Sequence, residues 1–427
     1  VPNEVGKRTT PSIVSFLPTE TLIGNSAAKK KTSNYKNTVY DCKRLIGRKV
    51  SDPEIQQDVA AWPFQVLSDP DGNPLITIEN SSSGKKSFTP EEISAMILHY
   101  LKVQAENFLG KSIKDAVITV PAYFDDSQRK ATEKAAHIAG FNVLRILDEP
   151  TAAALAYNFE QSETTQRILV YDLGGGTFDV SILEVGKQKV NVLASDGDNH
   201  LGGEDFDNKL IDYLFFKYKQ DKGVDMSKDR LWRARMHSAV EACKIELSVT
   251  SSSLIEFENS DFTYSVSRFL FENLNKDLFN RTIQVLENTL TKANLTKEMI
   301  DGIVLVGGST RIPRIQQLLH KYFPSSKMCK SVNPDEAVAM GGAIMAAVAA
   351  TQRLRAFPEV AVESFGIETQ GGLMEVMIPI NAPLPAVCSY EFVTPTDYQS
   401  WVEFRVAMGE RRLVRDNVVL GVVKLAE

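Results

Sequence analysis

A glycine-rich segment between two apolar strands, Asp172–Thr177 (Asp-Leu-Gly-Gly-Gly-Thr), restricts the fold of this chain more than any other feature. The flanking runs Ile168–Tyr171 and Phe178–Leu183 are apolar and of strand length, so the segment predicts a tight β-hairpin. Three successive glycines leave backbone N–H groups uncovered, which lets phosphate oxygens approach them closely. Asp172 is placed to hold a metal ion or its waters, and Asp179, two residues beyond the turn, lies on the same face. A plain glycine-rich turn with a capping Asp is the alternative interpretation.

A second glycine loop, Gly307–Arg311 (Gly-Gly-Ser-Thr-Arg), follows the apolar strand Ile303–Val306 and precedes the helix Arg314–Tyr322. It offers a nucleotide another set of backbone N–H groups. Its spacing matches neither the GxxxxGK[ST] phosphate loop nor the GxGxxG dinucleotide fingerprint. An ordinary strand–loop–helix corner is the competing interpretation.

Strands and helices alternate from about residue 110 to residue 350, which predicts an α/β fold with covered sheets. Further expected elements are the helices Pro90–Leu109, Gln128–Ala139, Thr151–Tyr157 and Ala337–Ala350 and the strands Pro11–Phe16, Ala116–Val120 and Val143–Leu147. Residues 68–84 carry turn signals and are expected to form a loop. Residues 363–427 change to short alternating segments, such as Trp401–Met408, which predict antiparallel β-structure without a helix.

Composition and residue spacing exclude several classes of protein. The 427-residue chain has 48 Lys and Arg against 54 Asp and Glu, a formal net charge of −6, which argues against electrostatic binding of nucleic acid. No apolar run reaches the ~18 residues of a membrane span. The four cysteines form no CxxC pair and the five histidines no HxxxH pair, so a disulfide framework or zinc site is not expected. A magnesium ion brought by a phosphate ligand remains compatible, because it needs only carboxylates and water.

Other polar residues are weaker candidates for chemistry. Glu149 stands at the end of an apolar strand before Pro150, a position well placed for a cleft. Lys43 is a mobile cation that can reach a phosphate, although surface Lys and Glu are common. Glu241, Lys244 and Ser248 share one helix face at i, i+3 and i+7, which suits either a surface ion pair or a polar wall for a sugar and base.

Together these segments resemble the 70-kDa heat-shock chaperone family, which has an actin-like ATPase fold. The resemblance runs nearly ungapped from about Asn3 to the C-terminus. Its most specific stretches are Ala116–Arg129, Asp148–Tyr157, Val170–Ile182, His200–Asp207 and Ile303–Pro313. The resemblance implies two duplicated ribonuclease-H-like lobes followed by an incomplete antiparallel β-sandwich. The implied nucleotide-binding ATPase domain covers residues 1–352, with lobe I at about 1–160 and lobe II at about 161–352. An interdomain linker follows at 353–362, and a partial peptide-binding β-sandwich at 363–427.

The resemblance also implies the roles of individual residues toward ATP or ADP and Mg²⁺. The residues around the γ-phosphate, the metal and the attacking water are Lys43, Glu149, Asp172, Thr177 and Asp179, with Asp172 facing the metal through water. The implied nucleotide-binding residues are Gly174, Gly175, Gly176, Gly202, Gly203, Glu241, Lys244, Ser248, Gly307, Gly308, Ser309, Arg311 and Asp335. Pro121 and Arg129 match positions that relay the nucleotide state to the outer surface.

The largest departure from the family pattern lies before Val1. Each half of the duplicated fold should supply one phosphate hairpin, and only Asp172–Thr177 is found. Losing one preorganised donor typically costs ~3–4 kcal/mol of barrier, so the chain as given is expected to hydrolyse ATP poorly. We therefore expect that the sequence is a piece of a longer protein whose first hairpin precedes Val1.

Further departures concern adenosine binding and the β region. Ile245 stands where the family usually has an Arg that stacks on adenine, so we expect weaker adenosine binding. Arg355 and Pro358 interrupt the apolar linker, which puts coupling between the domains in doubt. Trp401 replaces a small residue, so an altered peptide groove is expected, and the sandwich stops before its last strands and helical lid.

The function that the resemblance implies is an ATP-binding chaperone that couples nucleotide state to the binding of extended hydrophobic segments of unfolded proteins. J-domain cochaperones and nucleotide-exchange factors are the implied partners, and a reducing, cytoplasmic location is expected, without nucleic acid or membrane. The alternative is a catalytically impaired member that serves as a structural component of a larger assembly. A sugar kinase or filament protein on the same fold fits less well, because nothing marks a sugar site.

Overall fold

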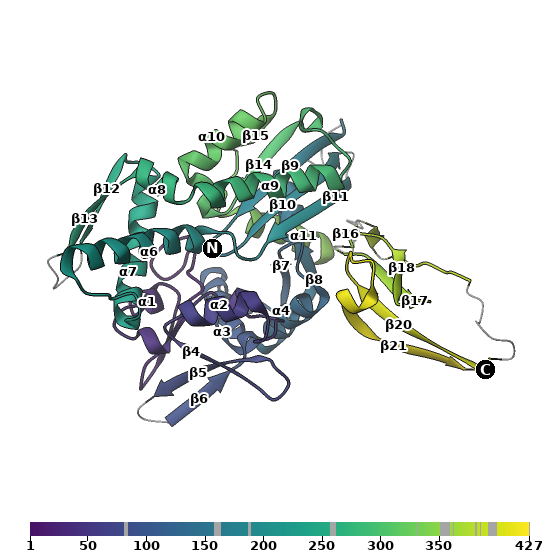
Figure 1. Cartoon of the computed structure of the whole chain (residues 1–427), viewed down its shortest axis with the longest axis horizontal. Coiled ribbons are helices and arrows are strands. Elements are labelled where there is room, and N and C mark those ends of the chain that lie inside the picture. Colours follow the sequence, from purple (N-terminus) through teal and green to yellow (C-terminus); the bar gives the residue numbers. More distant parts are fainter. Residues whose placement is uncertain are drawn as a thin grey trace.

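The computed structural model describes residues 1–80, 84–157, 164–186, 189–256, 262–329, 331–350, 359–361, 363–380, 382–384, 386–391 and 399–426. Figure 1 shows a two-lobed α/β body from which a smaller β region projects on one side. Most of the predicted linker, including Arg355 and Pro358, lies outside the described residues. No described helix has both the length and the apolar character that crossing a bilayer requires.

A five-stranded sheet forms the centre of lobe II, with strand order β11-β10-β9-β14-β15. Its strands are β9 (Gln166–Leu173), β10 (Phe178–Gly186), β11 (Lys189–Asp198), β14 (Gly302–Val306) and β15 (Lys327–Cys329). β9 and β10 form the predicted antiparallel hairpin, whereas β14 runs parallel to β9 with Val306 opposite Asp172. Because the carboxyl ends of β9 and β14 meet at one edge, the two glycine loops that follow these strands also meet there.

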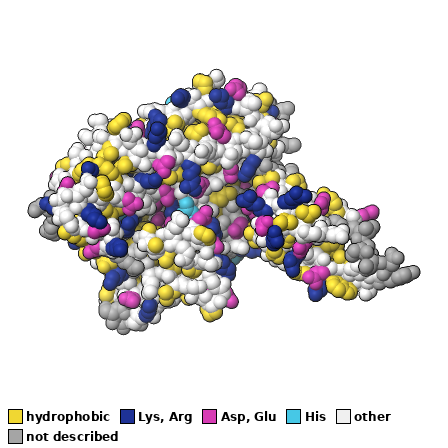
Figure 2. Space-filling view, in the orientation of Figure 1, with side chains coloured by type: hydrophobic (Ala, Val, Ile, Leu, Met, Phe, Trp, Pro, Cys, Tyr) yellow, Lys and Arg dark blue, Asp and Glu magenta, His cyan; other side chains and the backbone are white. Residues whose placement is uncertain are grey.

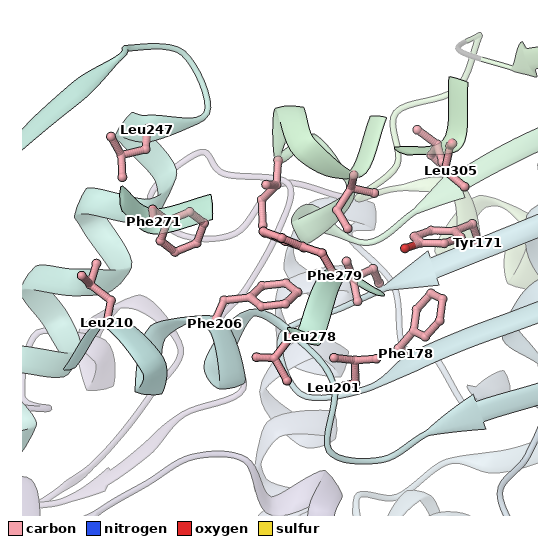
Figure 3. Packing of buried hydrophobic residues seen from close by; sticks show 14 of the residues in the cluster. Tyr171, Phe178, Leu201, Phe206, Leu210, Leu247, Phe271, Leu278, Phe279 and Leu305 are labelled. Atoms are coloured by element: carbon pink, nitrogen blue, oxygen red, sulfur yellow. The ribbon is translucent and has the colours of Figure 1, made fainter. Parts of the chain in front are cut away.

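Both faces of this sheet are covered, which explains why β9 is a continuous apolar run. Leu169, Tyr171 and Leu173 point into a large aromatic core with Phe206 and Phe279 (Figure 3). The alternate residues Ile168 and Val170 pack against the alanine-rich helix α5 (Glu149–Ala156). The helices of lobe II are α6 (Gly203–Lys222), α7 (Arg230–Leu247), α8 (Arg268–Leu274), α9 (Lys276–Lys292), α10 (Pro313–Tyr322) and α11 (Ala337–Ala350), and its short elements are β12 (Ser252–Glu256), β13 (Thr263–Ser267), η4 (Lys297–Met299) and η5 (Gly308–Arg311).

Lobe I repeats part of this plan around a smaller sheet. Two parallel strands, β7 (Asp115–Val120) and β8 (Asn142–Asp148), are joined through α4 (Asp126–Ile138) and followed by α5 (Glu149–Ala156), as β14 and β15 are joined through α10 and followed by α11. α5 and α11 pack against each other, and α11 also contacts β7. Among the described residues β7 pairs with β8 alone, so its middle residues are half-buried rather than fully buried.

The predicted helix at Pro90–Leu109 is confirmed as α3 with the same bounds. The Thr89 side chain accepts a hydrogen bond from the backbone N–H of Glu92, and the Glu92 carboxylate accepts one from the N–H of Thr89. This capping box satisfies two N–H groups that would otherwise lack partners, and Gly110 ends the helix in the left-handed region.

The expectation of a loop over residues 68–84 is wrong. β5 (Pro74–Asn80) pairs with β4 (Gln65–Ser68) and with β6 (Gly84–Phe88), because Ile76 and Ile78 bury themselves in the core of lobe I. Among the described residues of this range, the turn at residues 69–73 is the part that matches the sequence signal. The other elements of lobe I are β1 (Val14–Phe16), β2 (Thr21–Ile23), β3 (Thr38–Val39), α1 (Asn25–Ala28), α2 (Pro53–Ala61), η1 (Tyr35–Asn37) and η2 (Cys42–Arg44).

The C-terminal region is an antiparallel sheet with strand order β18-β17-β20-β21, as predicted. Its elements are β16 (Glu359–Val360), β17 (Phe365–Thr369), β18 (Leu373–Ile378), β19 (Pro383–Leu384), β20 (Trp401–Met408), η6 (Val414–Asp416) and β21 (Val418–Ala426). β16 contacts β11 of lobe II. Trp401 is 55% exposed, and β21 exposes apolar side chains such as Val422 and Leu425. Figure 2 shows basic and acidic side chains interspersed over the visible face of the molecule.

Candidate functional site

A cleft of about 690 Å³ between the lobes brings together residues from segments far apart in the sequence. Both lobes contribute to its walls. The predicted site residues that line it are Lys43, Glu149, Asp172, Gly174, Gly175, Gly176, Thr177, Glu241, Gly307 and Asp335. The cleft therefore joins the first glycine loop, the start of the second loop and a set of opposite charges.

The two aspartates of the β9–β10 hairpin form an acidic pair next to the first glycine loop, in which Asp179 is buried and Asp172 is half-buried. Asp172 and Asp179 are directly opposite each other in the antiparallel register, so their side chains share one face. Burial raises the pKa of Asp172 to about 7, the Glu149 carboxylate adds to the rise, and the Lys43 ammonium opposes it. Burial, together with the charges of Glu149 and Asp172, raises the pKa of Asp179 well above its usual range. This end of the cleft is therefore crowded with acidic groups.

Lys43 balances part of this charge. It is the middle residue of η2, and its Nζ donates to Glu149 Oε1 at 3.0 Å. Removal from water would lower the pKa of Lys43, but the carboxylates of Glu149, Asp172 and Asp179 together outweigh that effect and raise it. Lys43 consequently stays protonated while its side chain remains 47% exposed, so it can reach a ligand in the cleft.

The acidic pair fits a magnesium ion that is bound partly by a phosphate ligand. Asp179 Oδ1 is buried and has no hydrogen-bond partner among the described residues. No group of three or more His, Cys, Asp or Glu in the described part of the chain could hold a metal by itself. Magnesium usually takes one or two carboxylates together with waters and phosphate oxygens. Asp172 and Asp179 supply the carboxylates, and the remaining ligands would be waters and the phosphate oxygens of the nucleotide.

The first glycine loop is held from behind by the segment that begins α6. Gly203 N–H donates to Gly174 O at 3.1 Å, Glu204 N–H donates to Gly175 O at 2.7 Å, and a Cβ on Gly202 would lie 2.6 Å from Gly175 O. Ser309 Oγ, from the second glycine loop, donates to Gly174 O at 2.8 Å. Gly202, Gly203 and Ser309 thus support the loop and are not among the residues that line the cleft.

The residues predicted for adenosine are divided between two hollows. Ser248 and Arg311 line a second pocket of about 620 Å³, which Gln316, Gln317 and His320 help to form. Arg311 donates to Asp335 Oδ2 at 2.7 Å, and Asp335 lines the main cleft. The Lys244 ammonium is turned inward, because it donates to Asp207 at 2.5 Å and to Gly203 O at 3.0 Å. Ile245, next to Lys244 on α7, is 64% exposed.

The two predicted relay residues lie in the connection between β7 and β8, Pro121 directly after β7 and Arg129 in α4. The Arg129 guanidinium donates to the backbone oxygens of Ala122 and Phe124 at 3.0 and 2.9 Å, and to Asp148 at 2.6 Å. Pro121 begins the same turn after β7. Since Asp148 immediately precedes Glu149, Arg129 connects this turn to a residue of the cleft.

The sequence did not identify several ionisable residues that lie between the lobes. Tyr40, Asp41 and Glu204 also line the cleft, and burial together with the Glu204 charge raises the pKa of Asp41 to about 7. Arg44 contacts residues of both lobes. The sequence near Arg44 gave one hint of this role, its position directly after Lys43. The residues that Arg44 contacts are distant in the sequence, so no local pattern connects them.

Comparison with known proteins gives one consistent result. The sequence pattern of the family described as "Hsp70 protein" matches residues 1–427. The "Heat shock 70 kDa protein" of Neurospora crassa is 46% identical over 437 residues, covering 100% of this chain and 67% of that protein. A ribosome-associated molecular chaperone of Eremothecium gossypii is 44% identical, covering 99% of this chain and 70% of the relative. A ribosome-associated molecular chaperone of Saccharomyces cerevisiae is 43% identical with the same coverage.

Proposed function

This chain belongs to the Hsp70 family of chaperones, and we propose that its interlobe cleft binds ATP with Mg²⁺ to control the grip on unfolded polypeptides. The chaperone function agrees with the names of the relatives, which do not favour a purely structural role. One observation carries the assignment of the site. The first glycine loop and Gly307 of the second loop line a single cleft together with Lys43, Glu149 and Asp172, and Asp179 lies directly opposite Asp172 in the hairpin register.

The proposed arrangement for the phosphates follows from the residues around the first glycine loop. Backbone N–H groups of Gly175, Gly176 and Thr177 bind phosphate oxygens, since the N–H of Gly174 donates to Thr177 O, and the Lys43 ammonium neutralises the phosphate charge. Asp172 and Asp179 would hold the magnesium ion, which supplies charge stabilisation to the phosphate groups when it is bound. Phosphoryl transfer depends mainly on positioning and electrostatics, so these fixed groups are the parts that hydrolysis needs.

Glu149 and Asp179 are the groups that we propose for orienting the attacking water. The Asp179 Oδ1 atom is buried and unpaired among the described residues, so it can accept a hydrogen bond from water. Glu149 is fixed by the Lys43 ammonium on one side and follows Asp148, which Arg129 holds. A change at the phosphates can therefore reach the buried turn after β7 through Glu149 and Arg129.

For adenosine, we propose that Arg311 and Asp335 hold one side of the nucleoside and that Glu241 and Ser248 line the other. The Arg311–Asp335 ion pair is 52% and 30% exposed at its two side chains, so it can rearrange around a base. Ile245 supplies apolar contact without a cation–π interaction, which supports weaker base binding.

The proposed clients are extended apolar segments, which the C-terminal sheet would bind, and J-domain proteins and exchange factors are the proposed regulators. Two relatives are named as ribosome-associated chaperones, so nascent chains are one class of client that we propose. All four cysteines are free, which supports a reducing, cytoplasmic location as part of the same proposal.

Calorimetric titration with MgATP tests the nucleotide site. We expect saturable binding that Asp172→Asn weakens about tenfold or more, because charged hydrogen-bonding groups contribute roughly 1.5–3 kcal/mol. Asp225→Asn is the matched control, since Asp225 is a surface acid that pairs with Lys219 outside the cleft. Equal MgATP affinity for Asp172→Asn and the unchanged protein would refute the site.

Hydrolysis needs its own measurement. Single-turnover assays with labelled ATP should show slow hydrolysis that a peptide client and a J-domain protein accelerate. Binding without any accelerated hydrolysis would instead support a catalytically impaired member of the family.

A further inference from the structure

Arg44 is a deeply buried arginine beside the cleft, and its partners come from both lobes. It ends η2 in lobe I, and its side chain is only 4% exposed. A buried guanidinium requires paired charges and hydrogen bonds, because its removal from water is otherwise costly. The identity of those partners therefore indicates what Arg44 does.

The partners form a chain of contacts that crosses between the lobes. Arg44 Nη1 donates to Asp58 Oδ1 of α2 at 3.0 Å, and Nη2 donates to Asp205 Oδ2 of α6 at 2.9 Å. The other Asp58 oxygen, Oδ2, lies 2.7 Å from Nε2 of His200, which precedes α6. We call Arg44, Asp58, His200 and Asp205 the interlobe clasp. Figure 1 shows α2 of lobe I and α6 of lobe II facing each other across this boundary.

The clasp also touches the first glycine loop. Arg44 Nη2 donates to the backbone oxygen of Gly176 at 3.0 Å, and a Cβ on Gly176 would lie 3.0 Å from Arg44 Nε. A trans peptide group points its C=O and N–H in opposite directions. Holding Gly176 O toward Arg44 therefore turns the N–H of Thr177 away from Arg44, and both Gly176 and Thr177 line the cleft.

We propose that Arg44 is a positioning residue that fixes the Gly176–Thr177 peptide and holds the lobes closed, so that nucleotide leaves only when the interlobe clasp opens. The part that concerns nucleotide rests on the proposed function. The closing of the lobes rests on the clasp geometry alone. One guanidinium thus links lobe closure to the orientation of a phosphate-binding N–H group.

Asp205→Asn is the most informative variant, because it removes the charge at the lobe II end and leaves the Arg44–Asp58 pair intact. His200→Gln weakens the other contact between the lobes, from His200 to Asp58, and provides an independent test if Asp205→Asn fails to fold. Asp277→Asn is the matched control. It is the same change as Asp205→Asn, but Asp277 of α9 pairs with Lys209 of α6, and both residues belong to lobe II.

The first measurement needs no nucleotide. Spin labels at exposed positions of the two lobes, Lys85→Cys and Gln220→Cys, report the interlobe distance in a background with Cys329 and Cys388 replaced by Ser. We expect Asp205→Asn and His200→Gln to broaden the distance distribution toward longer values, while Asp277→Asn leaves it unchanged. Identical distributions for all four proteins would overturn the proposal.

The second measurement follows the release of fluorescent ADP after mixing with excess ATP. We expect Asp205→Asn to release ADP about 10- to 100-fold faster, the range associated with a lost charged hydrogen bond. Arg44→Lys should also lower kcat, because one ammonium cannot hold Asp58, Asp205 and Gly176 O together. Unchanged release for Asp205→Asn would overturn the gating role. If no variant binds nucleotide, the proposed function fails, and the distance measurement still decides the clasp.

Discussion

Two adjacent glycines in α11 offer a sharp test of how the centre of the molecule is packed. A Cβ on Gly341 would lie 1.7 Å from the backbone oxygen of Ala152 in α5. A Cβ on Gly342 would meet only Thr119 Cγ2, at an ordinary 3.7 Å. The substitutions Gly341→Ala and Gly342→Ala therefore add the same methyl group at neighbouring positions in the middle of α11. They differ in the space available to that methyl group.

The magnitude follows from these distances. Alanine in place of glycine stabilises a helix interior by about 0.5–1 kcal/mol, and Gly342→Ala should realise this gain. Gly341→Ala carries the same gain, but ordinary contact begins at 3.4 Å, so α5 and α11 must separate by about 1.7 Å. Overpacking typically costs about 1–3 kcal/mol, and here the contacted atoms are backbone that cannot rotate away. We expect Gly341→Ala to be less stable than Gly342→Ala by about 1–3 kcal/mol, the overpacking cost, because the helix gain is common to both variants.

Urea unfolding followed by circular dichroism measures this difference as a shift in midpoint between the two variants and the unchanged protein. Because α5 begins at Glu149, the separation of the helices should also weaken MgATP binding by Gly341→Ala. Equal urea midpoints for the two variants would refute the close packing of α5 on α11 and the reasoning that depends on it.

Three further predictions concern the base, the acidic pair and a helix cap. Ile245→Arg should tighten ATP binding in calorimetry by about 2- to 30-fold, since a cation–π contact contributes ~0.5–2 kcal/mol, whereas an unchanged affinity would contradict the stacking role. Because the pKa of Asp172 is raised from 3.8 to about 7, its protonated form favours the folded state. The ligand-free protein should therefore lose thermal stability as pH rises from about 4 to about 7, and Asp172→Asn should flatten this slope; an equal slope would count against the burial of that carboxyl. Thr89→Ala should lower the free energy of unfolding by about 1 kcal/mol through loss of the α3 cap, measured by urea unfolding, and no loss would show that the capping box contributes nothing.

Much of the local structure was predictable because its causes lie within a few residues. The capping pair Thr89 and Glu92 gave α3 its start, and Gly110 gave its end. The β9–β10 hairpin followed from a glycine-rich turn between two apolar runs. Residues 68–84 were misjudged, because the turn signal at Asp71 and Gly72 hid an alternation that becomes a strand only when Ile76 and Ile78 reach the lobe I core.

The sequence predicted which residues form the candidate site, but it did not predict the direction of every side chain. Lys43, Glu149 and Asp172 do converge on one cleft. Lys244, however, points to Asp207, since a buried carboxylate in direct contact binds the ammonium more strongly than an open cleft does. No spacing rule could anticipate that competition, because Asp207 and Lys244 are 37 residues apart on different helices.

By itself, the amino-acid sequence determined the features that depend on neighbouring residues: the glycine loops, the helix caps, the covered strands of an α/β fold and the change to antiparallel strands after Ala350. Only the tertiary structure decided which charges meet between the lobes. Arg44 and Asp205 are separated by 161 residues, yet their side chains are 2.9 Å apart. Packing of the two lobes creates that contact, and burial then requires every charge in it to find a partner, which is why its members act together.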